Sequence, residues 1–186
     1  MAQSVVDHAD KVAVRELVDN LTNGNKNVQS DYIKVLYEIG ERKPALISNY
    51  VKEFPALPES KNNRLVWGPM TALDTITLED PETIYSGLPA IIGATNSGSV
   101  IARDHAVSIL TKMVTIRKYE KTAFKLLIEQ LKTCPTNQLP MYAENAMRIV
   151  NNDNRKMFMN TLSSRMRSIE KLSKRRRVEH VIKKLG

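Results

Sequence analysis

A repeat of 37 residues constrains the fold of this chain more than any other feature. Val35, Leu36 and Ile39 lie on one stripe of a helix, and the same three positions are apolar again after one, two and three further periods. These later triplets are Ala72, Leu73, Ile76; Ile109, Leu110, Met113; and Ala146, Met147, Val150. Helical spacing that returns at a fixed period indicates stacked units, because one unit cannot bury its own apolar face.

Each of the four copies of this stripe is preceded by a further segment with helical spacing, and a fifth such segment follows the last copy. These first helices are predicted at 11–21, 44–54, 81–92, 120–131 and 156–172. The clearest start is Asp80-Pro81-Glu82. Asp caps a helix, Pro lacks a donor that the first turn leaves unused, and Glu complements the helix dipole. No alternating apolar and polar run lies between hairpin-type turns, so the sequence predicts an all-α chain.

These helix pairs predict one domain over residues 1–186, an α-solenoid of about four to five antiparallel pairs. Its units are expected at 11–41, 44–78, 81–116 and 119–152, followed by basic capping helices over 153–186. The apolar residues expected to bury the first capping helix are Phe158, Leu162, Met166, Ile169 and Leu172. Those expected to bury the last helix are Val178, Ile182 and Leu185.

A paired-helix repeat of this length resembles the HEAT family of α-solenoids, roughly over residues 12–150. Arg64 and Arg103 lie early in second helices and Pro44 and Pro81 open first helices, as in that family. Later units depart from the pattern, with Lys118 where the proline is expected. HEAT arrays are mostly binding scaffolds with unrelated partners, so the resemblance implies a superhelical all-α fold and a binding role.

The positive charge of the chain gathers near its C-terminal end. Residues 151–186 hold eleven Lys and Arg against three Asp and Glu, a net charge of +8, and the other 150 residues are formally neutral. The predicted basic patch consists of Arg165, Arg167, Lys171, Lys174, Arg175, Arg176, Arg177, Lys183 and Lys184. Clustered cations attract phosphates, anionic lipid or acidic proteins. The alternative interpretation is a solvated face that keeps the end of the array soluble.

A partner is expected on the face of the second helices opposite the apolar stripe, which would line a concave groove. The predicted groove residues are Lys34, Tyr37, Trp67, Asp104, Met141 and Arg148. Trp, Tyr, Met and Arg are favoured at interfaces because they bury large areas and keep a polar or adaptable group. The alternative for Trp67 is packing against Tyr32 or the next repeat.

Patterns that indicate catalysis are weak. His8, His105 and His180 are far apart, and none has a His or Cys at metal-ligand spacing. Cys134 precedes Pro135 in a predicted turn without a reactive-thiol signature. We therefore expect a chain that is not an enzyme and that needs no metal and no cofactor.

One enzymatic alternative comes from DNA alkylation-repair glycosylases, which are also built from HEAT-like repeats. Trp67, Asp104 and Arg148 would supply the aromatic, acidic and basic residues that such a resemblance implies. A surface that grips duplex DNA should carry cations along its length, because each phosphate contact contributes through counterion release. Here the cations gather at one end, which weighs against this alternative.

The expected location is cytoplasmic. No apolar run approaches the ~18–20 residues of a membrane span, and Met1–Asp10 lacks a basic-then-apolar leader pattern. A single cysteine favours a reducing compartment, although the basic run 174–177 also matches a nuclear localisation signal. The leading hypothesis is a non-catalytic protein–protein interaction module that binds a protein or acidic peptide in its groove. The alternative is a nucleic-acid-binding protein that uses the basic C-terminal segment. The oligomeric state is left open.

Overall fold

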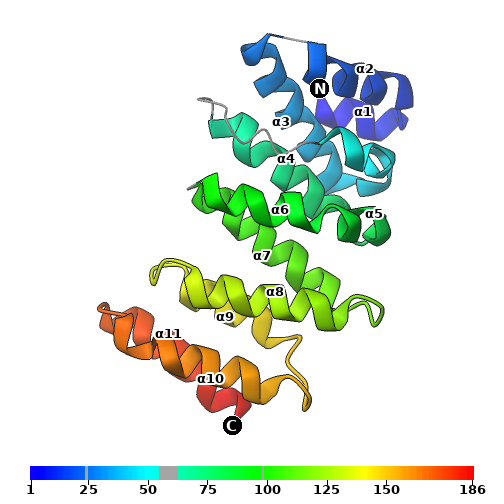
Figure 1. The fold of residues 1–186 in the computed structure, drawn as a ribbon. Coiled ribbons are helices and arrows are strands. Elements are labelled where there is room, and N and C mark those ends of the chain that lie inside the picture. The colour runs from blue at the N-terminus through cyan, green and yellow to red at the C-terminus, as the bar shows by residue number, and fades with distance from the viewer. Residues whose placement is uncertain (24, 55–62, 98) are drawn as a thin grey trace. The chain divides into compact units, whose positions relative to one another are not determined.

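The structure is a computed structural model that describes residues 1–23, 25–54, 63–97 and 99–186. Every regular element within these residues is a helix, so the predicted all-α class is confirmed (Figure 1). The chain divides into two compact units, Met1–Ile109 and Leu110–Gly186, which we call unit 1 and unit 2.

Unit 1 contains six α-helices, three short 3-10 segments and most of a seventh α-helix in its described residues. Their bounds are α1 Ala2–His8, α2 Lys11–Asn23, α3 Lys26–Arg42, η1 Pro44–Leu46, η2 Ser48–Glu53, α4 Asn63–Ile76, α5 Pro81–Ser86, α6 Leu88–Ala94, η3 Thr95–Ser97 and α7 Val100–Val114. Helix α3 is central, because α1, α2 and α4 all pack against it. The close approach of α4 depends on Gly68, since a Cβ atom there would lie 2.9 Å from Cγ1 of Ile33.

The repeated apolar stripe forms much of the core. Leu36, Leu73 and Leu110 occupy one column of the 37-residue spacing, and they are 0%, 5% and 0% exposed. The predicted burial of these three leucines is therefore confirmed. In the fourth copy Ala146 is buried, whereas Met147, the last residue of its helix, is partly exposed.

Two first helices of unit 1 differ from the predicted continuous segments. The segment 44–54 forms η1 and η2, and Tyr50 interrupts η2 with φ −109° and ψ 21°. The segment 81–92 is divided at Gly87 into α5 and α6. Pro89 explains this second break, because its ring would clash with the carbonyl of Tyr85 and it has no N–H for a continuous helix. Asp80 does cap α5, accepting from the Thr83 backbone N–H at 3.2 Å.

Unit 2 contains four complete α-helices in regular order. They are α8 Glu120–Thr133, α9 Leu139–Met147, α10 Arg155–Arg165 and α11 Leu172–Leu185, with the 3-10 turn η4 Met166–Ser168 before α11. The first helices α8 and α10 pack against each other, and so do the second helices α9 and α11. Phe158 and Leu162 of α10 are fully buried, as predicted.

The C-terminal capping segment differs from its predicted form. The helix expected over 156–172 ends at Arg165, and Ile169 is extended with φ −89° and ψ 102°. Ile169 stays buried, but Leu172 begins the next helix and is 56% exposed. In α11 the buried pair is Val178 and Val181, not the predicted set with Ile182 and Leu185, which are partly exposed.

Candidate functional site

The six predicted groove residues are divided between the units. Lys34 and Tyr37 lie on α3, Trp67 on α4 and Asp104 on α7, all within unit 1. Within unit 2, Met141 lies on α9 and is partly exposed, and Arg148 directly follows that helix and is exposed.

Tyr37 and Trp67 form a ring contact between α3 and α4. Their centroids are 5.8 Å apart with the planes tilted by 43°, and both side chains are partly exposed. Trp67 therefore packs against the preceding helix through Tyr37. Burial raises the pKa of the Tyr37 hydroxyl, and the nearby Arg64 opposes that shift. The aromatic pair is a semi-exposed apolar surface on these two helices. Lys34, one turn before Tyr37 on α3, has its ammonium group 3.9 Å from Glu38.

A polar relay that the sequence did not predict joins α4 to α7. The Asp74 carboxylate lies 2.9 Å from Nδ1 of His105, and Nε2 of the same ring lies 2.9 Å from Oγ1 of Thr71. The Thr71 hydroxyl also donates to the Trp67 carbonyl at 3.1 Å. Thr71 and Asp74 follow the predicted groove residue Trp67 at helical spacing on α4, and His105 directly follows Asp104 on α7. A search for polar pairs about one repeat apart would have brought them together.

The order carboxylate, imidazole, hydroxyl is that of a nucleophile relay, but the geometry supports a structural role. Thr71 is only 7% exposed, and its proton is directed to the backbone carbonyl of Trp67. The two nitrogens of the His105 ring each lie 2.9 Å from a side-chain oxygen of α4, Nε2 from Thr71 and Nδ1 from Asp74, so the ring bridges two residues of that helix. The relay thus ties α4 to α7 rather than exposing a nucleophile.

Two cations of the predicted basic patch bond to backbone carbonyls of other elements. Arg165 of α10 donates to the carbonyl oxygens of Leu131 and Cys134, at the carboxyl end of α8. Lys174 of α11 donates to the carbonyl oxygen of Asn137, ahead of α9. Both side chains hold unit 2 together, so their charge is partly used within the fold.

Two further patch cations are also engaged. Arg175 donates to the Ile169 carbonyl at 2.8 Å. Arg177 forms a two-pronged pair with Glu144 of α9, with N–O distances of 2.7 and 2.5 Å. The hydrogen bond from Arg177 lowers the pKa of the Glu144 carboxyl below its ordinary value, and burial partly opposes this.

The other five patch residues are exposed, and their side chains form no ion pair or hydrogen bond with any residue that the structure describes. They are Arg167, Lys171, Arg176, Lys183 and Lys184. On α11, Arg176, His180 and Lys183 follow at spacings of four and three residues, so they share one solvent-facing stripe opposite Val178 and Val181.

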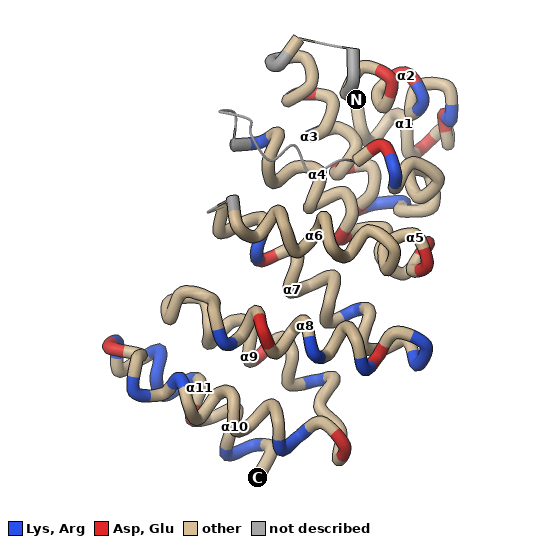
Figure 2. Tube along the Cα trace, in the orientation of Figure 1, with Lys and Arg blue, Asp and Glu red and all other residues tan. Residues whose placement is uncertain are grey.

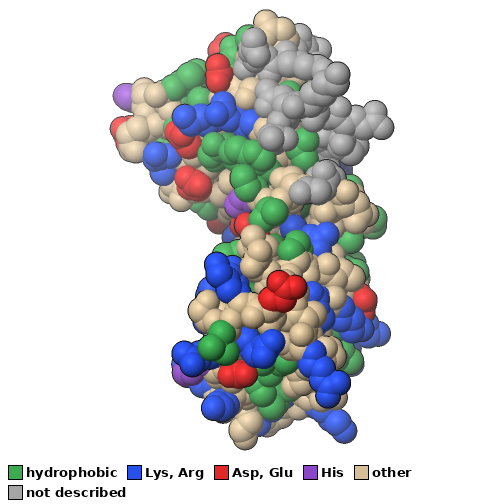
Figure 3. Space-filling model, turned by 90° about the vertical axis from the view of Figure 1, so that its left-hand side faces the viewer, with side chains coloured by type: hydrophobic (Ala, Val, Ile, Leu, Met, Phe, Trp, Pro, Cys, Tyr) green, Lys and Arg blue, Asp and Glu red, His purple; other side chains and the backbone are tan. Residues whose placement is uncertain are grey.

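The two units differ strongly in net charge. Unit 2 holds eighteen Lys and Arg against six Asp and Glu, a net charge of +12, whereas unit 1 holds ten against fourteen, a net charge of −4. Basic residues are distributed along α8, α10 and α11 (Figure 2). On the face of unit 2 drawn in Figure 3 the charged side chains are mainly Lys and Arg. The difference in net charge between the two units is larger than the predicted difference between residues 151–186 and the rest of the chain. The reason is that unit 2 begins at residue 110 and includes further Lys and Arg.

The described residues hold no group of three or more His, Cys, Asp and Glu that could bind a metal ion. Cys134 is 1% exposed, and its thiol lies 3.6 Å from the Leu131 carbonyl, which is the setting of a packed side chain. Among the helices of the described ranges, none combines the length and apolar character needed to cross a bilayer.

Comparison with known proteins gives no relative to set beside these features. No family model, no curated protein and no solved structure matches this chain.

Proposed function

We propose that this chain is a non-catalytic binding module, a HEAT-like α-solenoid whose unit 2 binds nucleic acid through its exposed cations. The observation that carries this proposal is the net charge of +12 on unit 2, against −4 on unit 1. A basic domain with cations on helical surfaces is the electrostatic pattern expected of a nucleic-acid-binding protein.

The solenoid part of the proposal is supported by bonds between residues about one repeat apart. In unit 2 Lys174 bonds to Asn137, 37 residues earlier, and Arg165 bonds to Leu131, 34 residues earlier. In unit 1 Thr71 and His105 are also 34 residues apart. Such bonds arise when successive helix pairs stack in the same orientation, so that each pair contacts its neighbour.

The free cations support a phosphate-rich partner. Arg176 and Lys183 lie two turns apart on one exposed stripe of α11, and neither is paired with another described residue. Seven residues along a helix span about 10.5 Å. Two cations at that spacing can contact separate phosphates along one nucleic-acid strand, and each contact releases condensed counterions.

The test is fluorescence anisotropy of labelled RNA and DNA, single-stranded and duplex, between about 50 and 200 mM salt. The variant is Arg176→Gln/Lys183→Gln, and the matched control is Lys11→Gln/Lys43→Gln, which removes two exposed cations from unit 1. For duplex, the slope of log affinity against log salt should fall by about 0.9 for each phosphate that the variant no longer neutralises. The control should match the unchanged chain.

Two outcomes would overturn the proposal. One is the absence of nucleic-acid binding at the lowest salt concentration. The other is polyglutamate that binds as tightly as nucleic acid at equal charge, which would assign the basic surface to acidic proteins. Equal weakening in the variant and the control would place the nucleic acid away from α11.

A second candidate function is docking of a protein or peptide against unit 1. The partly exposed Tyr37–Trp67 pair favours it, because aromatic pairs provide large contact areas at low entropic cost. Trp67→Ala should then abolish capture of such a partner and leave nucleic-acid affinity unchanged. If protein capture persists in Trp67→Ala, the aromatic pair is not the docking surface.

A further inference from the structure

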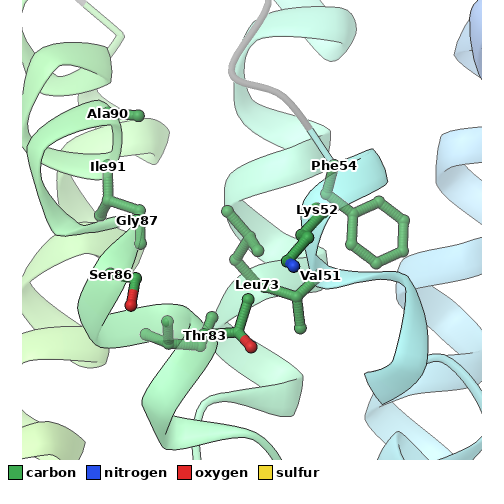
Figure 4. A pocket seen from close by; sticks show the side chains of 10 residues that line it. Val51, Lys52, Phe54, Leu73, Thr83, Ser86, Gly87, Ala90 and Ile91 are labelled. Carbon is green, nitrogen blue, oxygen red and sulfur yellow. The ribbon is translucent and has the colours of Figure 1, made fainter.

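A cavity of about 300 Å³ opens within unit 1, between η2, α4 and the corner at which α5 meets α6 (Figure 4). Its walls are apolar and come from side chains that are at most 8% exposed: Val51, Phe54, Leu73, Ile84 and Ile91. Pockets that bind small molecules have this character, with volumes that start near 300 Å³ and a few polar groups at fixed positions.

The cavity lies where the chain departs from regular repeat geometry. Two of the segments that the sequence predicts as continuous helices, 44–54 and 81–92, are broken in unit 1, and both line the cavity. Local departures from otherwise consistent patterns concentrate at functional sites. The break at Gly87 and the short η2 therefore point to a functional cause as well as a local one.

The rim of the cavity carries a cation and two hydroxyls. Figure 4 shows Lys52 of η2 ending in the space that faces the α5–α6 corner, with the hydroxyls of Thr83 and Ser86 on the α5 side. Lys52 is exposed and forms no ion pair with any described residue. The Ser86 hydroxyl donates to the Glu82 carbonyl at 3.0 Å. An apolar space with a cation at its mouth suits a ligand with an alkyl body and an anionic end.

We propose that this cavity binds a medium-chain carboxylate, with the alkyl chain against the apolar walls and the carboxylate beside Lys52. The volume sets the chain length: at about 30 Å³ for a water-sized group, 300 Å³ accommodates about ten such groups. Octanoate has eight carbons and two oxygens and therefore matches the space. This site is separate from the cations of unit 2, so it does not depend on the proposed nucleic-acid binding.

The test uses the full chain and octanoate as the probe. Methyl resonances of Val51, Leu73 and Ile84 should shift in carbon–proton spectra as octanoate is added, with one saturating curve. Hexanoate should bind about fifteenfold more weakly, because each buried CH₂ contributes about a factor of four. Octylammonium, with the opposite charge, should bind more weakly than octanoate. An absence of shifts at these methyls would overturn the proposal.

Two variants test where the carboxylate and the alkyl chain of the ligand lie. Lys52→Gln should weaken octanoate about tenfold, the value of a hydrogen bond to a charged group. It should also remove the preference for octanoate over octylammonium, whereas Lys43→Gln, an exposed lysine outside the cavity, should change neither. Unchanged octanoate affinity in Lys52→Gln would show that the carboxylate lies elsewhere.

The second variant fills the cavity. Ala90 is exposed on α6 and its side chain points toward the gap, so Ala90→Leu should occupy part of the space without disturbing the core. Octanoate affinity should then fall at least fourfold, while Ala45→Leu, an exposed alanine outside the lining, should leave it unchanged. Circular dichroism checks that both variants are folded. Equal affinities in the two variants would place the ligand outside this cavity.

Discussion

Gly40 of α3 faces Thr75 of α4 so closely that a Cβ atom at residue 40 would overlap the Thr75 hydroxyl oxygen. The same atom would lie 2.7 Å from Cδ1 of Ile47. Gly68 makes the reciprocal approach from α4 toward Ile33 of α3. The two helices therefore pack at a distance that only glycine allows at two points, and this close packing sets the surface on which Tyr37 and Trp67 meet.

Gly40→Ala should destabilise the protein by about 1–3 kcal/mol, because the added methyl overpacks the α3–α4 interface. Gly93→Ala is the matched control, since a Cβ at Gly93 on α6 meets nothing within 4 Å. That control should be neutral or should raise stability by about 0.5–1 kcal/mol through helix propensity. Urea unfolding measures both variants. Equal stability of the two would contradict the close approach of α3 and α4.

Arg165→Ala should destabilise unit 2 by about 1–3 kcal/mol, because the carbonyl oxygens at the end of α8 lose a charged donor. Arg165→Lys should recover only part of the loss, since an ammonium group cannot donate along the planar fork of a guanidinium. Urea unfolding, followed by circular dichroism, measures both. Arg167→Ala, an exposed neighbour, should stay within about 0.5 kcal/mol of the unchanged chain. A loss of the same size in Arg167→Ala would contradict the prediction that the hydrogen bonds of Arg165 to the end of α8 cause the loss of stability.

The apolar repeat made the all-α class and the burial of Leu36, Leu73 and Leu110 predictable, because helical periodicity reports which side of a helix faces a core. The broken helices were harder to predict. Pro89 is a readable signal for the division at Gly87, but Pro at the second position also begins helices, as Pro140 does in α9. Whether such a Pro divides a longer helix or begins a separate one depends on how the surrounding residues pack.

The partners of each charged side chain could not be predicted from the sequence. Arg165 and Arg167 are two residues apart and look equivalent in the sequence, yet one donates to three carbonyls of α8 and its end, and the other is exposed. Their roles depend on how α10 is rotated against α8. For the same reason His105 looked isolated, because its partners Thr71 and Asp74 lie on another helix.

His105→Ala should destabilise unit 1 by about 1–3 kcal/mol, because it removes two hydrogen bonds between α4 and α7. Thermal and urea unfolding measure the loss. Thr71→Val keeps the shape of the side chain and removes only the hydroxyl, so it should cost less than His105→Ala. His180→Ala, an exposed histidine on α11, should change stability by no more than about 0.5 kcal/mol. Full stability in His105→Ala would contradict the relay.

The ion pair between Glu144 and Arg177 predicts that the free energy of unfolding depends on pH. Because the Arg177 hydrogen bond lowers the pKa of Glu144 in the folded chain, the carboxylate stabilises the fold at pH values above its ordinary pKa. That stabilisation disappears as the pH falls through the lowered pKa of the folded state. Both side chains are more than one third exposed, so the pair should contribute only about 0.2–1 kcal/mol at neutral pH.

Urea unfolding of the unchanged chain and of Glu144→Gln, from pH 7 downward, measures this dependence. The difference in unfolding free energy should be constant down to the ordinary glutamate pKa near 4.5 and should shrink below it. Glu170→Gln, which removes an exposed carboxylate that has no ion pair with the described residues, should follow the unchanged chain to within about 0.5 kcal/mol. A difference for Glu144→Gln that grows as the pH falls has the wrong sign for a lowered pKa. That result would mean that Arg177 does not hold Glu144 ionised in the folded chain.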